Sequence, residues 1–200
     1  MSSYPDEPWD LHGHAYVGAW LLPKGDAPAP HSPATRTVTL FGRAIVCAAF
    51  FVYEDPSPLT YDEIMATVLV REGWRPRVSI THIWVNSVAS RDGGRRLWSI
   101  PKDLAGFEVA RHSSYAAQGI GSLAVTRTRR LPARLPIGFR IAQDRAGTVQ
   151  VSPVSGRIRF GLATARWSLA ADGPLGFLVG RKPLLTLACR PFHLLFGRRT

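Results

Sequence analysis

Short apolar runs separated by turn residues constrain the fold of this chain most strongly. The 200 residues include 18 glycines and 16 prolines, so few segments are free of both, which disfavours an all-helical protein. Between the turns the sequence alternates apolar and polar positions or is apolar on both faces, the two patterns of β-strands. We therefore predict a mostly β (α+β) fold: a single-domain antiparallel β-barrel or cone with few short helices. Strands are expected over residues 11–22, 36–40, 42–53, 60–71, 78–88, 104–113, 121–128, 137–143, 148–151, 156–169 and 184–196.

Length and composition favour one globular domain. Two hundred residues can bury a substantial core, and 46% apolar against 20% charged residues separates the chain from disordered proteins. We expect residues 1–8 to form a mobile N-terminal arm and residues 9–200 to form the domain. The Pro-rich stretch 23–33 is expected to be an exposed loop, because the segment before it is too short to fold alone.

The formal charge of +11 is compatible with nucleic acid, an anionic membrane surface or an acidic substrate as partner. The densest basic cluster consists of Arg127, Arg129, Arg130 and Arg134. Aromatic residues of the kind that stack on single strands do not interleave it, and the sequence has no zinc-finger or helix-turn-helix pattern. We interpret the arginines as a solvated surface and expect no nucleic-acid partner. A nucleic-acid or membrane-surface binder that uses the arginines is the remaining alternative.

Metal, disulfide and membrane signals are weak. Cys47 and Cys189 lie far apart in apolar runs and no C-x-x-C is present, so both are expected to be buried thiols. His12 and His14 form an H-x-H pair without a third ligand in sight, so no metal site is expected. The N-terminus is acidic and the longest apolar run, 44–53, is shorter than a membrane span. We expect a cytoplasmic protein with no membrane partner.

Lys102 is the residue whose identity most needs an explanation. Of 25 basic residues only Lys24, Lys102 and Lys182 are lysines, and the other 22 are arginines. Because arginine supplies positive charge elsewhere, lysine indicates a need for an amine that can lose its proton and attack a carbonyl. Pro101 fixes its own φ and pushes Ile100 towards extended geometry, so Lys102 leaves a constrained bend.

The residues around Lys102 would lower the pKa of its amine by desolvation. Leu97, Trp98 and Ile100 surround it with apolar bulk in the sequence, and Trp84 is expected to add to it. Attack on a carbonyl needs the neutral amine, so its pKa must fall from about 10.4 towards about 7. Asp103 would oppose this if it faced the amine, although adjacent side chains of an extended segment point to opposite sides.

Glu63 is the second candidate. Strand alternation places it on one face with Tyr61, Met65 and Thr67. A carboxylate on a face suited to a core is costly unless it is paired or used, although a carboxylate at the rim is the simpler alternative. On the next strand, His82 is expected beside Trp84, where it either lines a pocket or is a hydrogen-bonded core histidine.

These residues resemble the acetoacetate decarboxylase family, whose nucleophile segment reads roughly G-R-E-x-(aromatic)-(small)-(aromatic)-P-K-K. The positions that fit in order and without gaps are Gly94, Arg95, Trp98, Ser99, Pro101 and Lys102. The family also has an acidic residue in an upstream Tyr-x-Glu strand, and Tyr61-Asp62-Glu63 matches it 39 residues before Lys102. Three positions depart from the pattern: Arg96 for the glutamate, Ile100 for the second aromatic and Asp103 for the second lysine.

The resemblance implies a β-rich, cone-like barrel and a Schiff-base lyase that acts on a β-keto acid or related keto acid. It implies Lys102 and Glu63 as catalytic residues, no cofactor and no metal, and a homo-oligomer. The substrate-binding candidates are Arg95, Trp98, Tyr61, His82 and Trp84, and Arg95 has the alternative of holding the turn in place. A non-catalytic small-molecule binding barrel, or an aldolase- or dehydratase-type relative that uses the same lysine, is the alternative function.

Overall fold

The computed structural model describes residues 4–110 and 112–198. These residues form twelve strands, one α-helix and two short 3-10 helices. Their bounds are β1 Trp9–Pro23, η1 Lys24–Asp26, β2 Arg36–Thr37, β3 Thr39–Leu40, β4 Arg43–Glu54, β5 Tyr61–Glu72, β6 Arg75–Val85, α1 Val88–Trp98, β7 Lys102–Leu104, β8 Phe107–Ala110, β9 Ser114–Ala117, β10 Gly121–Arg145, β11 Thr148–Leu169, η2 Gly176–Leu178 and β12 Leu185–Phe196.

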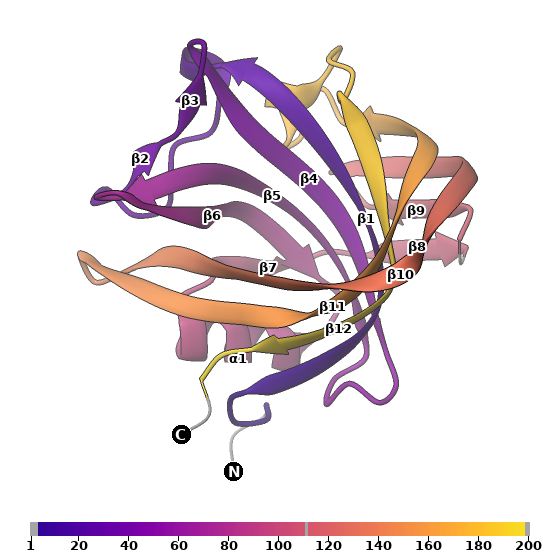
Figure 1. Cartoon of the computed structure of the whole chain (residues 1–200), viewed down its shortest axis with the longest axis horizontal. Coiled ribbons are helices and arrows are strands. Elements are labelled where there is room, and N and C mark those ends of the chain that lie inside the picture. Colours follow the sequence, from indigo (N-terminus) through magenta and orange to yellow (C-terminus); the bar gives the residue numbers. More distant parts are fainter. Residues whose placement is uncertain (1–3, 111, 199–200) are drawn as a thin grey trace.

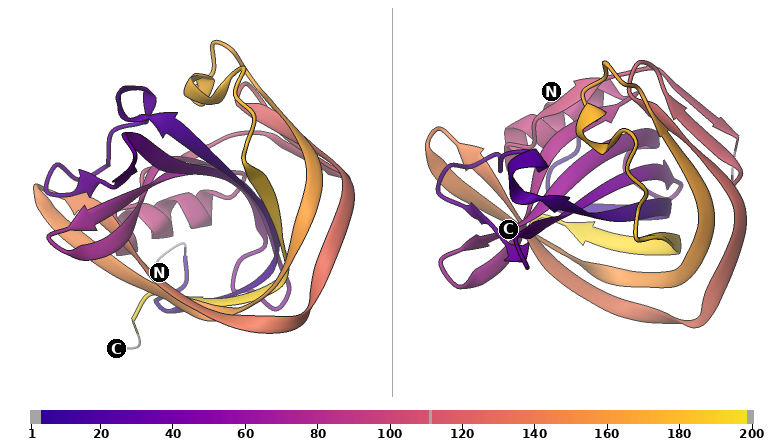
Figure 2. Two further views of the ribbon diagram at one scale, coloured as in Figure 1. Left: turned by 45° about the horizontal axis from the view of Figure 1, so that its top comes forward. Right: turned by 90° about the horizontal axis from the view of Figure 1, so that it is seen from above.

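The strands form one curled sheet in the order β7-β6-β5-β4-β1-β12-β11-β10-β9-β8. A bridge between Val78 of β6 and Ile141 of β10 closes most of this path into a ring (Figure 1). Neighbouring strands are antiparallel except for the β6–β7 and β6–β10 pairs. In the left view of Figure 2, α1 is seen through the opening of the ring. The prediction of a mostly β, largely antiparallel, barrel-like fold with few helices is confirmed.

Strands β10 and β11 are longer than the sequence predicted. The sequence predicted separate strands over 121–128 and 137–143, but β10 runs through Pro132 and Pro136 between them, with a register shift between Arg130 and Arg134. Proline lacks an N–H and is tolerated at strand edges and bulges. Here β9 pairs only with the start of β10, and β6 touches it at Ile141, so the middle of β10 has a partner on one side alone.

A β-bulge in β6 changes which residues face the interior of the ring. The register against β5 shifts between Ile80 and His82, which leaves Thr81 as an extra residue on β6. Val78 and Ile80 therefore line the interior before the bulge, and Ile83 lines it afterwards. Regular alternation would place His82 and Trp84 on the same face as Ile80, and the bulge prevents this.

The segment before β1 packs against the rest of the molecule. The Trp9 indole donates a hydrogen bond to the carbonyl of Pro5 at 2.9 Å, and Glu7 accepts one from the indole of Trp98 at 2.8 Å. Residues 1–3 of the expected N-terminal arm lie outside the described residues. The mobility of the N-terminal arm, residues 1–8, stays a prediction. No helix among residues 4–110 and 112–198 is long and apolar enough to cross a membrane.

Candidate active site

The end of α1 positions Lys102. Ser99 closes the helix in the left-handed conformation, with φ of 54°, and donates its backbone N–H to the last helical carbonyls. The N–H of Ile100 bonds the carbonyl of Gly94 at 3.1 Å, and Pro101 prevents the helix from continuing. The chain then enters β7, where Lys102 pairs in parallel with Ile83 of β6. The helix α1, Val88–Trp98, thus ends four residues before the lysine.

The two glycines of α1 allow close contacts with two large side chains. A Cβ on Gly94 would lie 2.8 Å from Cδ and 2.9 Å from Cε of Lys102. A Cβ on Gly93 would lie 2.6 Å from the Trp9 ring. All three distances are shorter than ordinary van der Waals contact, so the absence of a side chain at position 94 lets the lysine stem run along the helix.

The Lys102 amine is buried and makes three polar contacts. Its Nζ lies 2.8 Å from Oε2 of Glu63, 2.9 Å from Oγ of Ser90 and 3.3 Å from the Tyr61 hydroxyl. Lys102 is 3% exposed and Glu63 is 2% exposed. An ammonium has three N–H donors, so these contacts satisfy all of them.

The second oxygen of Glu63 is also used. Oε1 accepts a hydrogen bond from the Tyr53 hydroxyl at 3.1 Å, and the rings of Tyr53 and Tyr61 stack with centroids 4.4 Å apart. The site therefore contains Lys102 and Glu63 with the hydroxyls of Tyr53, Tyr61 and Ser90. Sequence reasoning missed Tyr53 and Ser90.

Both missed residues had a signal in the sequence. A tight turn between the strands at 42–53 and 60–71 pairs Tyr53 with Tyr61, as the observed register shows, and this places their side chains on one face. Ser90 lies four residues before Gly94 on α1, so the two share the face of the helix that contacts Lys102. Recognising the second signal required the segment 88–98 to be taken as a full helix.

Burial and the neighbouring carboxylate act in opposite directions on Lys102. Burial alone would lower the pKa of the amine, but Glu63 and, next, Tyr61 favour the ammonium form and leave the pKa above its ordinary value. The expectation that apolar surroundings lower this pKa is therefore wrong for the ligand-free protein, because Glu63 is in direct contact. Burial, reinforced by Glu63, also raises the pKa of Tyr53 well above its ordinary value, so its hydroxyl keeps its proton.

Lys102 lies at a cavity of about 350 Å³ inside the ring. Tyr61, Trp98 and Ile100 also line it. Of the 28 described residues that line the cavity, only Lys102 and Glu63 are charged. Burial raises the pKa of the Cys47 thiol to about 11 and that of Cys189 to about 12, so these two thiols keep their protons and add no charge to the cavity.

Arg95 does not reach the cavity. Its Nε donates to the carbonyl of Lys102 at 2.6 Å, its Nη2 lies 3.7 Å from Asp103, and its side chain is 51% exposed. Arg95 therefore holds the bend in place, which was the alternative to a substrate-binding role. Asp103 points outward with a side chain that is 66% exposed, on the opposite side of β7 from the amine.

His82 and Trp84 do not line this cavity, so the expectation that they bind substrate there is wrong. The β6 bulge places both on the outer face, where His82 packs on Phe177 with ring centroids 5.5 Å apart. Trp84 packs at the edge of the outer cluster around Ile64 and Tyr115. His82 is half-buried with its Nδ1 3.0 Å from the Thr81 hydroxyl, and burial lowers its pKa, so it is closer to the alternative of a hydrogen-bonded core histidine.

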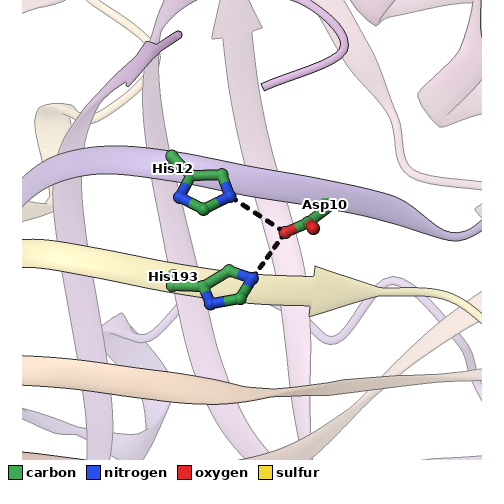
Figure 3. A group of neighbouring side chains, drawn as sticks. All are labelled: Asp10, His12 and His193. Atoms are coloured by element: carbon green, nitrogen blue, oxygen red, sulfur yellow. Dashed lines mark hydrogen bonds and ion pairs between the residues drawn. The ribbon is translucent and has the colours of Figure 1, made fainter. Parts of the chain in front are cut away.

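A separate group of histidines lies on the outer face of β1 and β12 (Figure 3). His12 and His193 are paired across the two strands and stack with centroids 4.3 Å apart. Both contact the same oxygen of Asp10, His12 at 3.1 Å and His193 at 2.6 Å. His14 is buried elsewhere, with its Nε2 at 3.0 Å from the Tyr115 hydroxyl. The side chains of Asp10 and His193 are at least half exposed. The contacts of His12 and His193 with Asp10 account for the way in which these three side chains are grouped.

Comparison with known proteins relates this geometry to one family. The family model described as acetoacetate decarboxylase (ADC) matches residues 33–149, which include Glu63 and Lys102. A search of the curated proteins gave no match.

Solved structures share the fold at low sequence identity. An acetoacetate decarboxylase from Legionella pneumophila is 15% identical, with a TM-score of 0.67 over 99% of this chain and 89% of that chain. An acetoacetate decarboxylase-like enzyme from Sphingomonas wittichii RW1 is 14% identical, with a TM-score of 0.59 over 98% and 93%. The enduracididine biosynthesis enzyme MppR, in a structure complexed with pyruvate, is 14% identical, with a TM-score of 0.57 over 96% and 88%. With a family model that matches more than half of its length, the chain belongs to the acetoacetate decarboxylase family.

Proposed function

We propose that this protein is a Schiff-base lyase that decarboxylates a β-keto acid, or a related keto acid, through Lys102. The observation that supports this most strongly is the buried amine at the cavity wall, 2.8 Å from the Glu63 carboxylate. A β-keto acid resists losing CO2 because the electron pair of the broken C–C bond needs an acceptor. An iminium formed between the ketone and a lysine is such an acceptor.

The first step removes the proton from Lys102. The pKa of the amine is raised in the ligand-free protein, so the amine carries a proton at neutral pH. Glu63 is within proton-transfer distance, and in an apolar cavity a neutral amine and a neutral carboxylic acid lose less solvation than two ions. Glu63 therefore takes the proton as the substrate carbonyl enters.

Imine formation then returns the proton. The free amine attacks the carbonyl carbon, and the resulting carbinolamine loses its hydroxyl as water with the proton held by Glu63. The products are an iminium on Lys102 and a Glu63 carboxylate next to it, which is again an ion pair. The hydroxyls of Ser90 and Tyr61, at 2.9 and 3.3 Å from Nζ, orient the nitrogen during these changes.

Loss of CO2 removes charge from the cavity. The substrate carboxylate leaves as neutral CO2, and its electron pair moves to the iminium nitrogen to give a neutral enamine. Separated charges are less stable in a medium of low dielectric constant, so an apolar lining favours this step. Protonation of the enamine carbon and hydrolysis of the imine release the ketone and regenerate Lys102.

Two alternatives remain, each supported by one observation. A structure of MppR is described as complexed with the condensation product of pyruvate and imidazole 4-carboxaldehyde, which supports aldol or dehydration chemistry in a related fold. The raised pKa of Lys102 supports a non-catalytic binding barrel, in which the amine stays an ammonium. The keto-acid partner, a homo-oligomeric state, a cytoplasmic location and the absence of nucleic-acid or membrane partners stay predictions.

The test is release of CO2 from a panel of β-keto acids, with a parallel assay for aldol condensation of pyruvate with aldehydes. Lys102→Met alone would leave a buried carboxylate without its cation, at a cost of about 3–5 kcal/mol. The matched variant is therefore Lys102→Met combined with Glu63→Gln, which removes both charges. We expect CO2 release by the wild-type protein and none by this variant at an unchanged fold. Condensation without CO2 release would support the aldolase alternative, and binding without either reaction would support the binding barrel.

A further inference from the structure

The cavity extends well beyond the Lys102 amine. Glu63, Met65 and Thr67 are successive inward residues of β5 and all line it. A strand rises about 3.3 Å per residue, so Glu63 and Thr67 are separated by about 13 Å along the cavity wall. A four-carbon keto acid bound at Lys102 would leave most of this length empty.

The strand register shows what fills the remaining length. Next to the Glu63 row, Met65 pairs with Ala49, Ala49 with Val17, and Val17 with Leu187, across β5, β4, β1 and β12. Side chains paired in this way lie on one face of the sheet, and all four line the cavity. The small side chain of Ala49 leaves open space where the Glu63 row has Phe51.

The far part of the cavity is apolar. Its polar atoms are the hydroxyl of Thr67 and the thiol of Cys47, which pair with each other across β5 and β4. Ile137 and Phe139 of β10 and Phe160 of β11 also line the cavity and are apolar. Water there would find few hydrogen-bond partners, whereas a hydrocarbon chain needs none.

The carboxylate end of a substrate has one cationic partner. Among the described residues that line the cavity, Lys102 alone carries a positive charge. A bound keto acid therefore obtains its charge pairing from the lysine, or from the iminium that replaces it, and most of its affinity must come from elsewhere. Apolar contact along the β5 wall is the available source.

We propose that the substrate is a keto acid with a long or bulky apolar tail, which lies along β5 past Met65 while its carbonyl is at Lys102. This rests on the proposed function for the placement of the carbonyl, but the apolar subsite rests on the cavity alone. Each methylene that enters the far part should strengthen binding about fourfold. Affinity should rise with tail length until the cavity is filled.

A series of ligands measures the binding of the tail and the formation of the imine separately. Methyl ketones from acetone to methyl nonyl ketone correspond to the decarboxylation products and are chemically stable. Their displacement of a fluorescent apolar probe reports occupancy of the cavity, and borohydride reduction followed by mass spectrometry reports the imine at Lys102. Displacement that strengthens with tail length but gives no imine would support the subsite and contradict the Schiff-base function. Imine formation that is equal for short and long ketones would support the function and overturn the tail proposal.

Two cavity variants should move the optimal tail length of the ketone in opposite directions. Ala49→Leu narrows the far part, so ketones with long tails should lose at least tenfold in affinity while acetone is unaffected. Met65→Ala enlarges it and should favour longer tails, which gives a second test if the first variant does not fold. Ala124→Leu is the matched control, because Ala124 is exposed on β10 and is not among the lining residues, and it should behave as wild type. An unchanged tail preference in a folded Ala49→Leu protein would overturn the proposal.

Discussion

At the residue scale, the pair of Lys102 and Glu63 determines what the site can do. Burial is the largest single influence and lowers the pKa of the amine, but Glu63 and Tyr61 together outweigh it, so the pKa is raised. In the proposed mechanism the same carboxylate, 2.8 Å from the amine, is the base that removes the proton when a carbonyl arrives. Glu63 thus stabilises the resting ammonium, and the proposed mechanism gives it a second role, in which it generates the neutral, nucleophilic amine of Lys102.

Glu63→Gln separates these two roles. With the carboxylate removed, burial remains and the pKa of Lys102 should fall below its ordinary value, so the amine should react faster with an acylating reagent at neutral pH. Turnover should nevertheless fall by about 10²–10⁴-fold, because no group transfers the protons. Peptide mapping of the acylated lysine and CO2 release measure the two effects. Tyr53→Phe is the control, since it keeps the carboxylate and removes one hydrogen bond to it; slower acylation in Glu63→Gln would contradict this account.

Asp103 provides a second prediction at this scale. It stands where the family has a second lysine, but its side chain is 66% exposed and contacts Arg95 rather than the amine. Asp103→Lys should therefore move the acidic limb of the pH–rate profile by only a few tenths of a unit, since solvent screens the new charge. A downward shift of a full unit would show that position 103 controls the amine.

Sequence reasoning found the centre of the site and missed its surroundings. The scarcity of lysine and the alternation around Glu63 indicated two residues that the structure brings together with Tyr61. The positions of His82 and Trp84 were predicted wrongly because β6 contains one extra residue. It leaves no clear mark in the sequence, yet it moves the side chains that follow it to the opposite face of the sheet.

At the element scale, α1 and the bend after it place the lysine. The N-terminal turn of α1 contributes Ser90, its last turn contributes Gly94, and its C-cap redirects the chain into β7. Strand types and approximate positions followed from the sequence, because alternation is a local property. The continuation of β10 through two prolines could not be predicted from the sequence, because it depends on which edge of the strand has no hydrogen-bonded partner strand.

Gly94→Ala tests the close contact between α1 and Lys102. Alanine gains about 1 kcal/mol of helix propensity over glycine, and crowding of the lysine stem costs about 1–3 kcal/mol, so stability should stay the same or fall by up to about 2 kcal/mol. The amine should be displaced and CO2 release should fall at least tenfold. Gly93→Ala is the matched control: it meets the rigid Trp9 ring instead, so it should lower the melting temperature more and activity at permissive temperature less. Full activity in Gly94→Ala would contradict the assigned contact.

At the scale of the whole molecule, closure of the sheet creates the cavity. One bridge between β6 and β10 brings together strands that lie far apart in the chain, and no local pattern predicts it. The sequence indicated that the inward faces of the strands are apolar, but it did not indicate the volume of the cavity that they enclose. The outer face carries a second core that includes Tyr16, Phe50 and Tyr115, and His14 contacts it.

His14 should make the folded protein sensitive to acid. Burial lowers its pKa to about 4, against the opposing influence of Glu54, so it is neutral in the folded state while the unfolded chain binds the proton at about 6.5. The unfolded state therefore binds more protons between these values, and stability should fall by about 3 kcal/mol as the pH drops from 6.5 to 4. Urea unfolding across this range measures the loss. His14→Gln should be less stable at neutral pH and lose less on acidification; an equal loss would exclude His14 as the cause.

The central claim is that Lys102 is a nucleophile, and reductive trapping tests it most directly. The protein is incubated with a keto acid and borohydride, digested, and examined by mass spectrometry for a reduced adduct. Lys24 and Lys182 are exposed surface amines in the same chain and serve as internal controls. We expect the adduct on the peptide that contains Lys102, and no adduct there in Lys102→Arg. Equal labelling of all three lysines, or no adduct from any keto acid that the protein binds, would contradict the Schiff-base account.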